Sequence, residues 1–102
     1  LLLPHVMSIN LTADHGKYAR IAQLLGERTD LLAPRQAAEA SVTAVRALAE
    51  DLGMDLKLRD FGITQTDIPT MAEAAMKVTR LMNNNPRQLT ADDCERIYRA
   101  AF

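Results

Sequence analysis

Apolar residues recur at intervals of three and four along most of the chain, which is the spacing of one face of an α-helix. The longest such stripe passes through Ala38, Val42, Val45, Ala49 and Leu52. Pro34 suits the first turn of that helix, and Gly53 suits the position just after its end. The pattern therefore predicts an all-α fold, and we expect a single unit of four to five helices over residues 1–102.

Three other helices have recognisable ends. Thr12 is the expected cap of a helix that closes at Gly26, with 27–32 as a loop. Thr64 or Thr66 should start another helix with Pro69 in its first turn, and residues 83–86 should stop it. Its expected buried side consists of Ile68, Met71, Ala75, Val78 and Met82.

The last helix carries the strongest local signal. Thr90 is the expected N-cap, with Asp93 three residues later where a carboxylate meets free backbone amides. Cys94, Ile97, Tyr98 and Ala101 share one face. Asp92 with Arg96 and Glu95 with Arg99 are charge pairs four residues apart, which indicates that the opposite face is solvated.

Net charge and cysteine content narrow the classes of partner and cellular compartment that the chain favours. Twelve basic and 13 acidic residues give a net charge of −1, which favours no strongly charged partner. Cys94 is the only cysteine, so an intrachain disulfide is excluded and a cytoplasmic location is expected. The apolar run Leu1–Met7 is too short to span a membrane and lacks the features of a signal peptide. Because this run opens the chain without a cap, we expect a piece of a larger protein.

One segment of the sequence is similar to a nucleic-acid-binding motif. Tyr18–Gly26 is similar to the first helix and turn glycine of a helix-turn-helix motif. The next expected helix is rich in alanine and poor in cations, so it could supply little phosphate contact. We therefore expect no nucleic-acid partner.

Candidate chemical groups are few. The four glycines stand apart, so no glycine-rich phosphate loop is encoded. His5 and His15 lie on either side of an expected helix boundary and form no metal-ligand pair; we expect His5 in an apolar contact and His15 in solvent. Asp92 and Asp93 are expected to cap a helix rather than to catalyse proton transfer, and Cys94 to be a buried, inert thiol.

Several segments, in order along the chain, resemble one family. The opening Leu-Leu-Pro-His-Val-Met followed by Asn10 and the closing Asn85-Pro86-Arg87, with Thr90, Asp93 and 97–101, are similar to the C-terminal stretch of the iron-containing (group III) alcohol dehydrogenases. Segments 17–22, 58–63 and 67–69 also resemble that family. The resemblance covers essentially the whole chain.

The resemblance implies a two-domain oxidoreductase with an N-terminal nucleotide-binding α/β domain and a helical C-terminal domain. Its cofactors would be NAD(P) and a divalent metal, usually iron and sometimes zinc. That family holds its metal with one aspartate and three histidines, and the last histidine belongs to a Pro-His-Gly motif just before the segment matching Leu1–Met7. No catalytic, cofactor-binding or metal residue is therefore carried over, and His5 matches a later, non-ligand motif.

One position, Leu81, has a possible substrate-pocket role, because relatives can place a side chain beside the substrate there. The alternative for Leu81 is plain packing at the end of a helix stripe. The three consecutive asparagines at 83–85 depart from the small or glycine residues of relatives, which leaves the turn geometry open.

For function, we expect part of a metal- and NAD(P)-dependent alcohol dehydrogenase that is inactive as this chain alone. Its expected partners are the missing N-terminal nucleotide-binding domain and further copies in a homo-oligomer, with no membrane. The alternative is a stand-alone helical interaction or dimerisation module derived from such an enzyme.

Overall fold

The computed structural model describes all residues from 1 to 102 and contains helices and no strand, so the expected all-α fold is confirmed. Three short 3-10 turns, η1 (Leu11–Ala13), η2 (Leu58–Phe61) and η3 (Gln65–Asp67), accompany the α-helices. The α-helices number six rather than four to five: α1 (Leu3–Asn10), α2 (His15–Leu24), α3 (Pro34–Asp51), α4 (Ile68–Met76), α5 (Thr79–Met82) and α6 (Ala91–Ala101).

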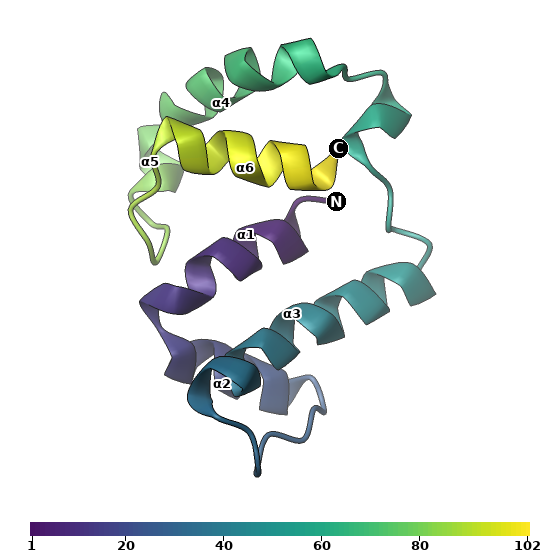
Figure 1. Cartoon of the computed structure of the whole chain (residues 1–102), viewed down its shortest axis with the longest axis vertical. Helices are drawn as coiled ribbons and strands as arrows, with labels where there is room; N and C mark the ends of the chain where they lie inside the picture. Colours follow the sequence, from purple (N-terminus) through teal and green to yellow (C-terminus); the bar gives the residue numbers. More distant parts are fainter.

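Helix α1 lies in the middle of the molecule. It packs against α3 on one side and α6 on the other, while α2 pairs with α3 and α4 pairs with α6 (Figure 1). The first and last residues of the chain lie side by side (Figure 1). This arrangement brings both family-like segments, residues 1–10 and 85–101, to the same part of the fold.

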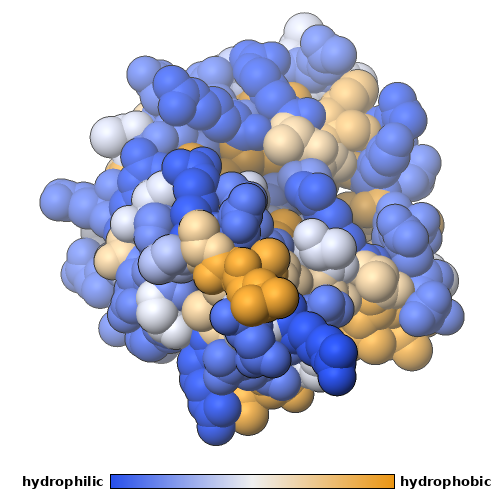
Figure 2. Space-filling view, turned by 60° about the horizontal axis from the view of Figure 1, so that its bottom comes forward, coloured by the Kyte–Doolittle hydropathy of each residue, from blue (hydrophilic) through white to orange (hydrophobic).

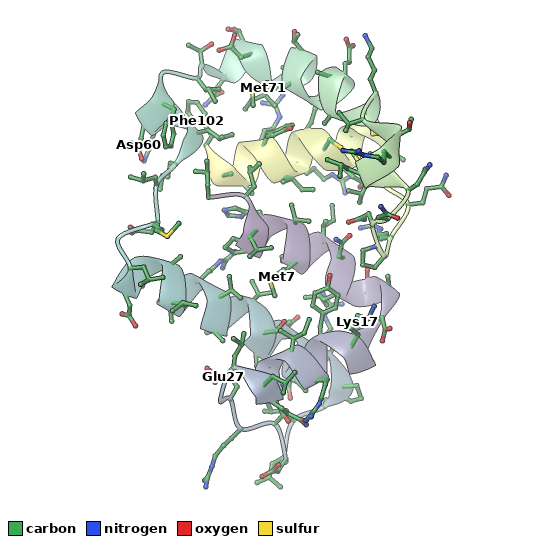
Figure 3. The ribbon with its side chains drawn as sticks, turned by 180° about the vertical axis from the view of Figure 1, so that it is seen from behind. Met7, Lys17, Glu27, Asp60, Met71 and Phe102 are labelled. Carbon is green, nitrogen blue, oxygen red and sulfur yellow. The ribbon has the colours of Figure 1, made fainter.

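The principal core joins the first three helices. Met7, on the side of α1 that faces α3 (Figure 3), clusters with Leu11, Tyr18, Ala38 and Val42. Ala38 is fully buried, and its small side chain lets α2 and α3 approach closely. The α3 stripe is covered only in its first half, because Leu52 remains 63% exposed.

Helix α2 begins later than the sequence predicted. Its cap is Asp14, whose carboxylate accepts the backbone N–H of Lys17 at 3.0 Å. The expected cap, Thr12, instead lies in η1, and its hydroxyl donates to the Ile9 carbonyl at 3.5 Å. The 3-10 turn that continues α1 thus moves the start of the next helix by two residues. Asp14, with a non-helical backbone (φ −159°, ψ 84°), is the residue that caps it.

The expected single helix from Thr64 or Thr66 to Met82 is interrupted. Val78 has ψ of 64°, which is not helical, and this residue separates α4 from α5. As a result Val78 is 45% exposed instead of buried, which corrects the predicted stripe. Residues 83–86 do end α5, as expected. None of the six α-helices combines the length and the apolar character that a membrane-spanning helix requires.

Candidate functional site

An apolar pocket lies between α1, α4, α5 and α6. Its volume is about 170 Å³, and nine of its ten lining residues are hydrophobic. Apolar cavities of about 150 Å³ stay dry and bind molecules the size of benzene. The pocket could therefore hold the hydrocarbon part of a small molecule. Its lining comprises Leu2, Val6, Ala75, Leu81, Met82, Asn85, Leu89, Cys94, Ile97 and Tyr98.

Leu81 belongs to this lining, from the short helix α5. Leu81 is 62% exposed, so it lines the pocket without being part of the buried core. This position is compatible with the expected pocket role of Leu81, which stays a prediction.

The turn after α5 is anchored to the end of α1 by amide hydrogen bonds. Asn10 donates to the side-chain oxygen of Asn85 at 2.6 Å, and Asn85 donates back to that of Asn10 at 2.8 Å. Asn85 also donates to the Arg87 carbonyl. Because Asn85 lines the pocket, the pair fixes one wall of it.

Arg87 adds a second tie between the same segments. Its guanidinium donates to the Ile9 carbonyl at 3.2 Å and lies 3.8 Å from the Asp93 carboxylate. In the sequence, Asn10, Asn85 and Arg87 belong to family-like motifs, and Asn85 also belongs to the expected helix stop at 83–86, but none of the three has an expected partner. No local signal predicts the Asn10–Asn85 and Ile9–Arg87 contacts, because they join residues that are 75 and 78 positions apart.

Thr90 and Asp93 form the capping box that the sequence predicted. The Asp93 carboxylate accepts the backbone N–H and the hydroxyl of Thr90 at 2.9 and 3.0 Å, and the hydroxyl accepts the Asp93 N–H at 3.2 Å. The backbone hydrogen bond is the main cause that holds the pKa of Asp93 below its usual value; the Thr90 hydroxyl, Arg87 and Arg96 act in the same direction, and burial opposes them. Asp93 is therefore a charged cap, as expected, and its geometry is not that of a proton shuttle.

Two further titratable groups line the pocket. Cys94 is 4% exposed, its Sγ lies 3.6 Å from the Met76 Sδ, and burial followed by the Asp93 charge raises its pKa. Burial also raises the pKa of Tyr98. Both groups are protonated at neutral pH, so the expected buried, unactivated thiol is confirmed.

The two histidines lie apart. His5 on α1 is partly buried and borders a hollow together with Arg46, so it is not enclosed in a purely apolar contact as expected. Burial is the main cause that lowers the pKa of His5, and the charge of Arg46 adds to it. His15 starts α2, but its Nε2 is buried without a hydrogen-bond partner, which corrects the expectation of a solvated side chain.

No three His, Cys, Asp or Glu side chains lie close enough to hold a metal ion. The residues of this chain thus do not form a site that fits the metal of the family.

Curated relatives match the whole chain. It is 41% identical over 102 residues to 1,3-propanediol dehydrogenase of Citrobacter freundii and 37% identical over 102 residues to lactaldehyde reductase of Escherichia coli (strain K12). It is 31% identical over 100 residues to the NAD-dependent methanol dehydrogenase of Bacillus methanolicus. The alignments cover 98–100% of this chain but only 26% of each relative. The chain thus spans about a quarter of the length of these relatives.

Solved structures show the same relationship in three dimensions. A crystal structure of 1,3-propanediol oxidoreductase superposes with a TM-score of 0.95 at 41% identity, covering 100% of this chain and 26% of that one. An alcohol dehydrogenase from Oenococcus oeni superposes with a TM-score of 0.91 at 39% identity, covering 99% and 26%. The sequence model described as "Fe-containing alcohol dehydrogenase family, C-terminal" matches residues 1–102. This chain therefore belongs to the Fe-containing alcohol dehydrogenase family, and it corresponds to the family's C-terminal part.

Proposed function

We propose that this chain is the C-terminal helical part of a metal- and NAD(P)-dependent alcohol dehydrogenase, which interconverts an alcohol and its aldehyde or ketone. The observation that carries the proposal is the superposition of the entire chain on 1,3-propanediol oxidoreductase with a TM-score of 0.95. The three curated relatives are named as dehydrogenases of 1,3-propanediol and of methanol and as a reductase of lactaldehyde.

The role proposed for this chain is to supply an apolar wall of the substrate site. The pocket beside α5 offers mostly hydrocarbon surface, and the Asn10–Asn85 pair holds its rim in place. Such a wall favours the carbon chain of an alcohol and excludes water from it. In the whole enzyme, a bound metal would polarise the alcohol oxygen and a nicotinamide would exchange hydride with the carbon.

On its own the chain should have no dehydrogenase activity. It contains no three-ligand metal cluster and no glycine-rich phosphate loop. The 102-residue chain should therefore give no NAD(P)-linked oxidation of 1,3-propanediol with Fe²⁺ or Zn²⁺ added. The full-length Citrobacter freundii relative is the positive control, and turnover above a heat-treated sample would refute this part of the proposal.

A chimeric enzyme tests the proposed role directly. The matched 26% of the Citrobacter freundii enzyme is replaced by this chain, and NAD(P)-linked oxidation of 1,3-propanediol is measured. Because this chain is 41% identical to the 1,3-propanediol oxidoreductase of known structure and superposes on it with a TM-score of 0.95, the helices of this chain should pack in the chimera as the native helices do. Activity of the chimera supports the proposal. A folded chimera that binds iron but has no activity on any short alcohol would contradict it.

The second candidate function is a stand-alone helical module that dimerises. It is favoured by the large apolar side chains left exposed, some of which form patches at the end of the molecule near the α2–α3 loop (Figure 2). Light scattering distinguishes the two functions, because a stable dimer at all concentrations supports the module. Aggregation or loss of fixed tertiary structure supports a chain that needs its missing N-terminal nucleotide-binding domain. The most exposed of these side chains are Leu3, Leu24, Leu31, Leu52, Met54, Phe61 and Leu81.

A further inference from the structure

A second hollow, separate from the apolar pocket, lies between α1, α3 and α6. Its volume is about 320 Å³, and its polar lining consists of His5 and Ser8 from α1, Arg46 from α3 and Arg96 from α6. Its other lining residues are apolar, so no carboxylate lines it. Three helices therefore bring two arginines, a histidine and a serine to the border of one hollow.

The two arginines of this hollow have no ion-pair partner. The three ion pairs of the chain use Arg35, Arg87 and Arg99. The Asp92–Arg96 pair that the sequence predicted does not form, and Glu50, one turn after Arg46, makes no ion pair either. Neither Arg46 nor Arg96 donates a hydrogen bond to another side chain, so their donors are free for a ligand.

The positive field reaches the neighbouring titratable groups. Arg46 contributes to lowering the pKa of His5, after the larger effect of burial, and Arg96 contributes slightly to lowering the pKa of Asp93. Asp93 accepts its hydrogen bonds from Thr90 and forms its ion pair with Arg87, so it forms no direct contact with the Arg96 guanidinium. An anion in the hollow would relieve the repulsion between Arg46 and a protonated His5.

We propose that this hollow is a binding site for a phosphate-type dianion, such as the phosphoryl group of a small metabolite, held by Arg46, Arg96 and Ser8. Guanidinium groups match phosphate oxygens with paired, charge-assisted hydrogen bonds, and two of them balance a dianion. The Ser8 hydroxyl, which is exposed beside them, can donate a further hydrogen bond. The site does not depend on the dehydrogenase reaction.

Inorganic phosphate is the probe, and ¹H–¹⁵N NMR of the 102-residue chain is the measurement. At constant ionic strength, saturable shifts are expected at Ser8, Arg46 and Arg96, and the pKa of His5 should rise as phosphate binds. Arg46→Gln and Arg96→Gln should each weaken binding about tenfold, since each removes a charged donor. Arg35→Gln is the matched control, because Arg35 is an exposed α3 arginine paired with Glu39, and its variant should bind phosphate normally.

Acetate provides the contrasting ligand. It carries one charge, so it should bind at least tenfold more weakly than phosphate to the same residues. Equal binding of acetate and phosphate would overturn the assignment in favour of a carboxylate. The proposal also fails if phosphate causes no saturable shift at Ser8, Arg46 or Arg96, or if all three arginine variants lose affinity equally.

Discussion

The side-chain amides of Asn10 and Asn85 form two reciprocal hydrogen bonds between residues 75 positions apart. Asn10 is only 3% exposed, so its amide has little access to water. This pair connects the end of α1 to the turn after α5, and it joins the two ends of the chain that carry the family-like motifs. Leu81, four residues before Asn85, lines the same pocket as Asn85.

Replacing Asn85 by alanine should destabilise the fold by about 2 kcal/mol, because it leaves the buried Asn10 amide without its partner. Urea unfolding followed by circular dichroism measures the change. Asn84→Ala is the control, since the Asn84 side chain makes only an exposed hydrogen bond to the Arg80 carbonyl. The Asn10→Ala, Asn85→Ala double variant should lose less than the sum of the single variants. A strictly additive result would argue against the pairing.

The Thr90 capping box should contribute more to the free energy of unfolding than the Thr12 hydroxyl does. Thr90→Ala removes an N-cap, which costs about 1 kcal/mol. Thr12→Ala should change the free energy of unfolding by less than about 0.5 kcal/mol, because an exposed side chain outside any cap contributes little. Thermal unfolding of both variants measures the difference. Equal losses would restore Thr12 as the cap of α2 and contradict the structure.

Asp93 should make stability depend on pH in acid. Its pKa is lower in the folded chain than in the unfolded chain, chiefly because it accepts the Thr90 backbone N–H. Its contribution is therefore complete above the unfolded value of about 3.9 and is lost as the pH falls through the lower folded value. Thermal midpoints recorded from pH 6 to pH 2 should fall less steeply for Asp93→Asn than for the parent. Parallel curves would show that other carboxylates set the acid limit.

The sequence was sufficient to predict those helices whose determining contacts are local. Pro34 with the α3 stripe, and Thr90 with Asp93, involve residues within a few positions of one another, and both predictions are confirmed. It was insufficient at Val78, where a helical stripe continues through a non-helical residue. The stripe is a property of spacing alone, and spacing does not show that the backbone leaves the helical conformation at Val78.

The candidate site was less predictable than the fold. Family resemblance singled out Leu81, but the residues that surround the pocket come from four helices and could not be assembled from periodicity. Likewise, His15 has the expected position in the first turn of α2, but its place in the sequence does not indicate that its Nε2 is buried. The pocket depends on contacts between distant segments, which helical spacing does not reveal.

Leu81 should influence which alcohols the chimeric enzyme prefers. Leu81→Ala removes apolar surface from the pocket, so kcat/KM for a four-carbon alcohol should fall about tenfold relative to a two-carbon alcohol. Leu48→Ala is the matched control, because Leu48 is a leucine on α3 with 49% exposure and lines none of the described cavities. An unchanged ratio for Leu81→Ala would assign that side chain to packing.

Two glycines should respond to alanine with opposite signs. Gly53, just after α3, has φ of +69°, and an L-residue in that conformation costs about 1 kcal/mol. Gly16 lies in the first turn of α2, where an added Cβ would meet only an Asp14 oxygen at 3.6 Å, an ordinary contact. Gly16→Ala should therefore stabilise by about 0.5 to 1 kcal/mol through the lower entropy of the unfolded chain. For a chain of this size, the thermal midpoint should rise by about 2 to 8 °C for Gly16→Ala and fall by about 4 to 8 °C for Gly53→Ala. Shifts of the same sign would mean that α2 or the end of α3 is built differently.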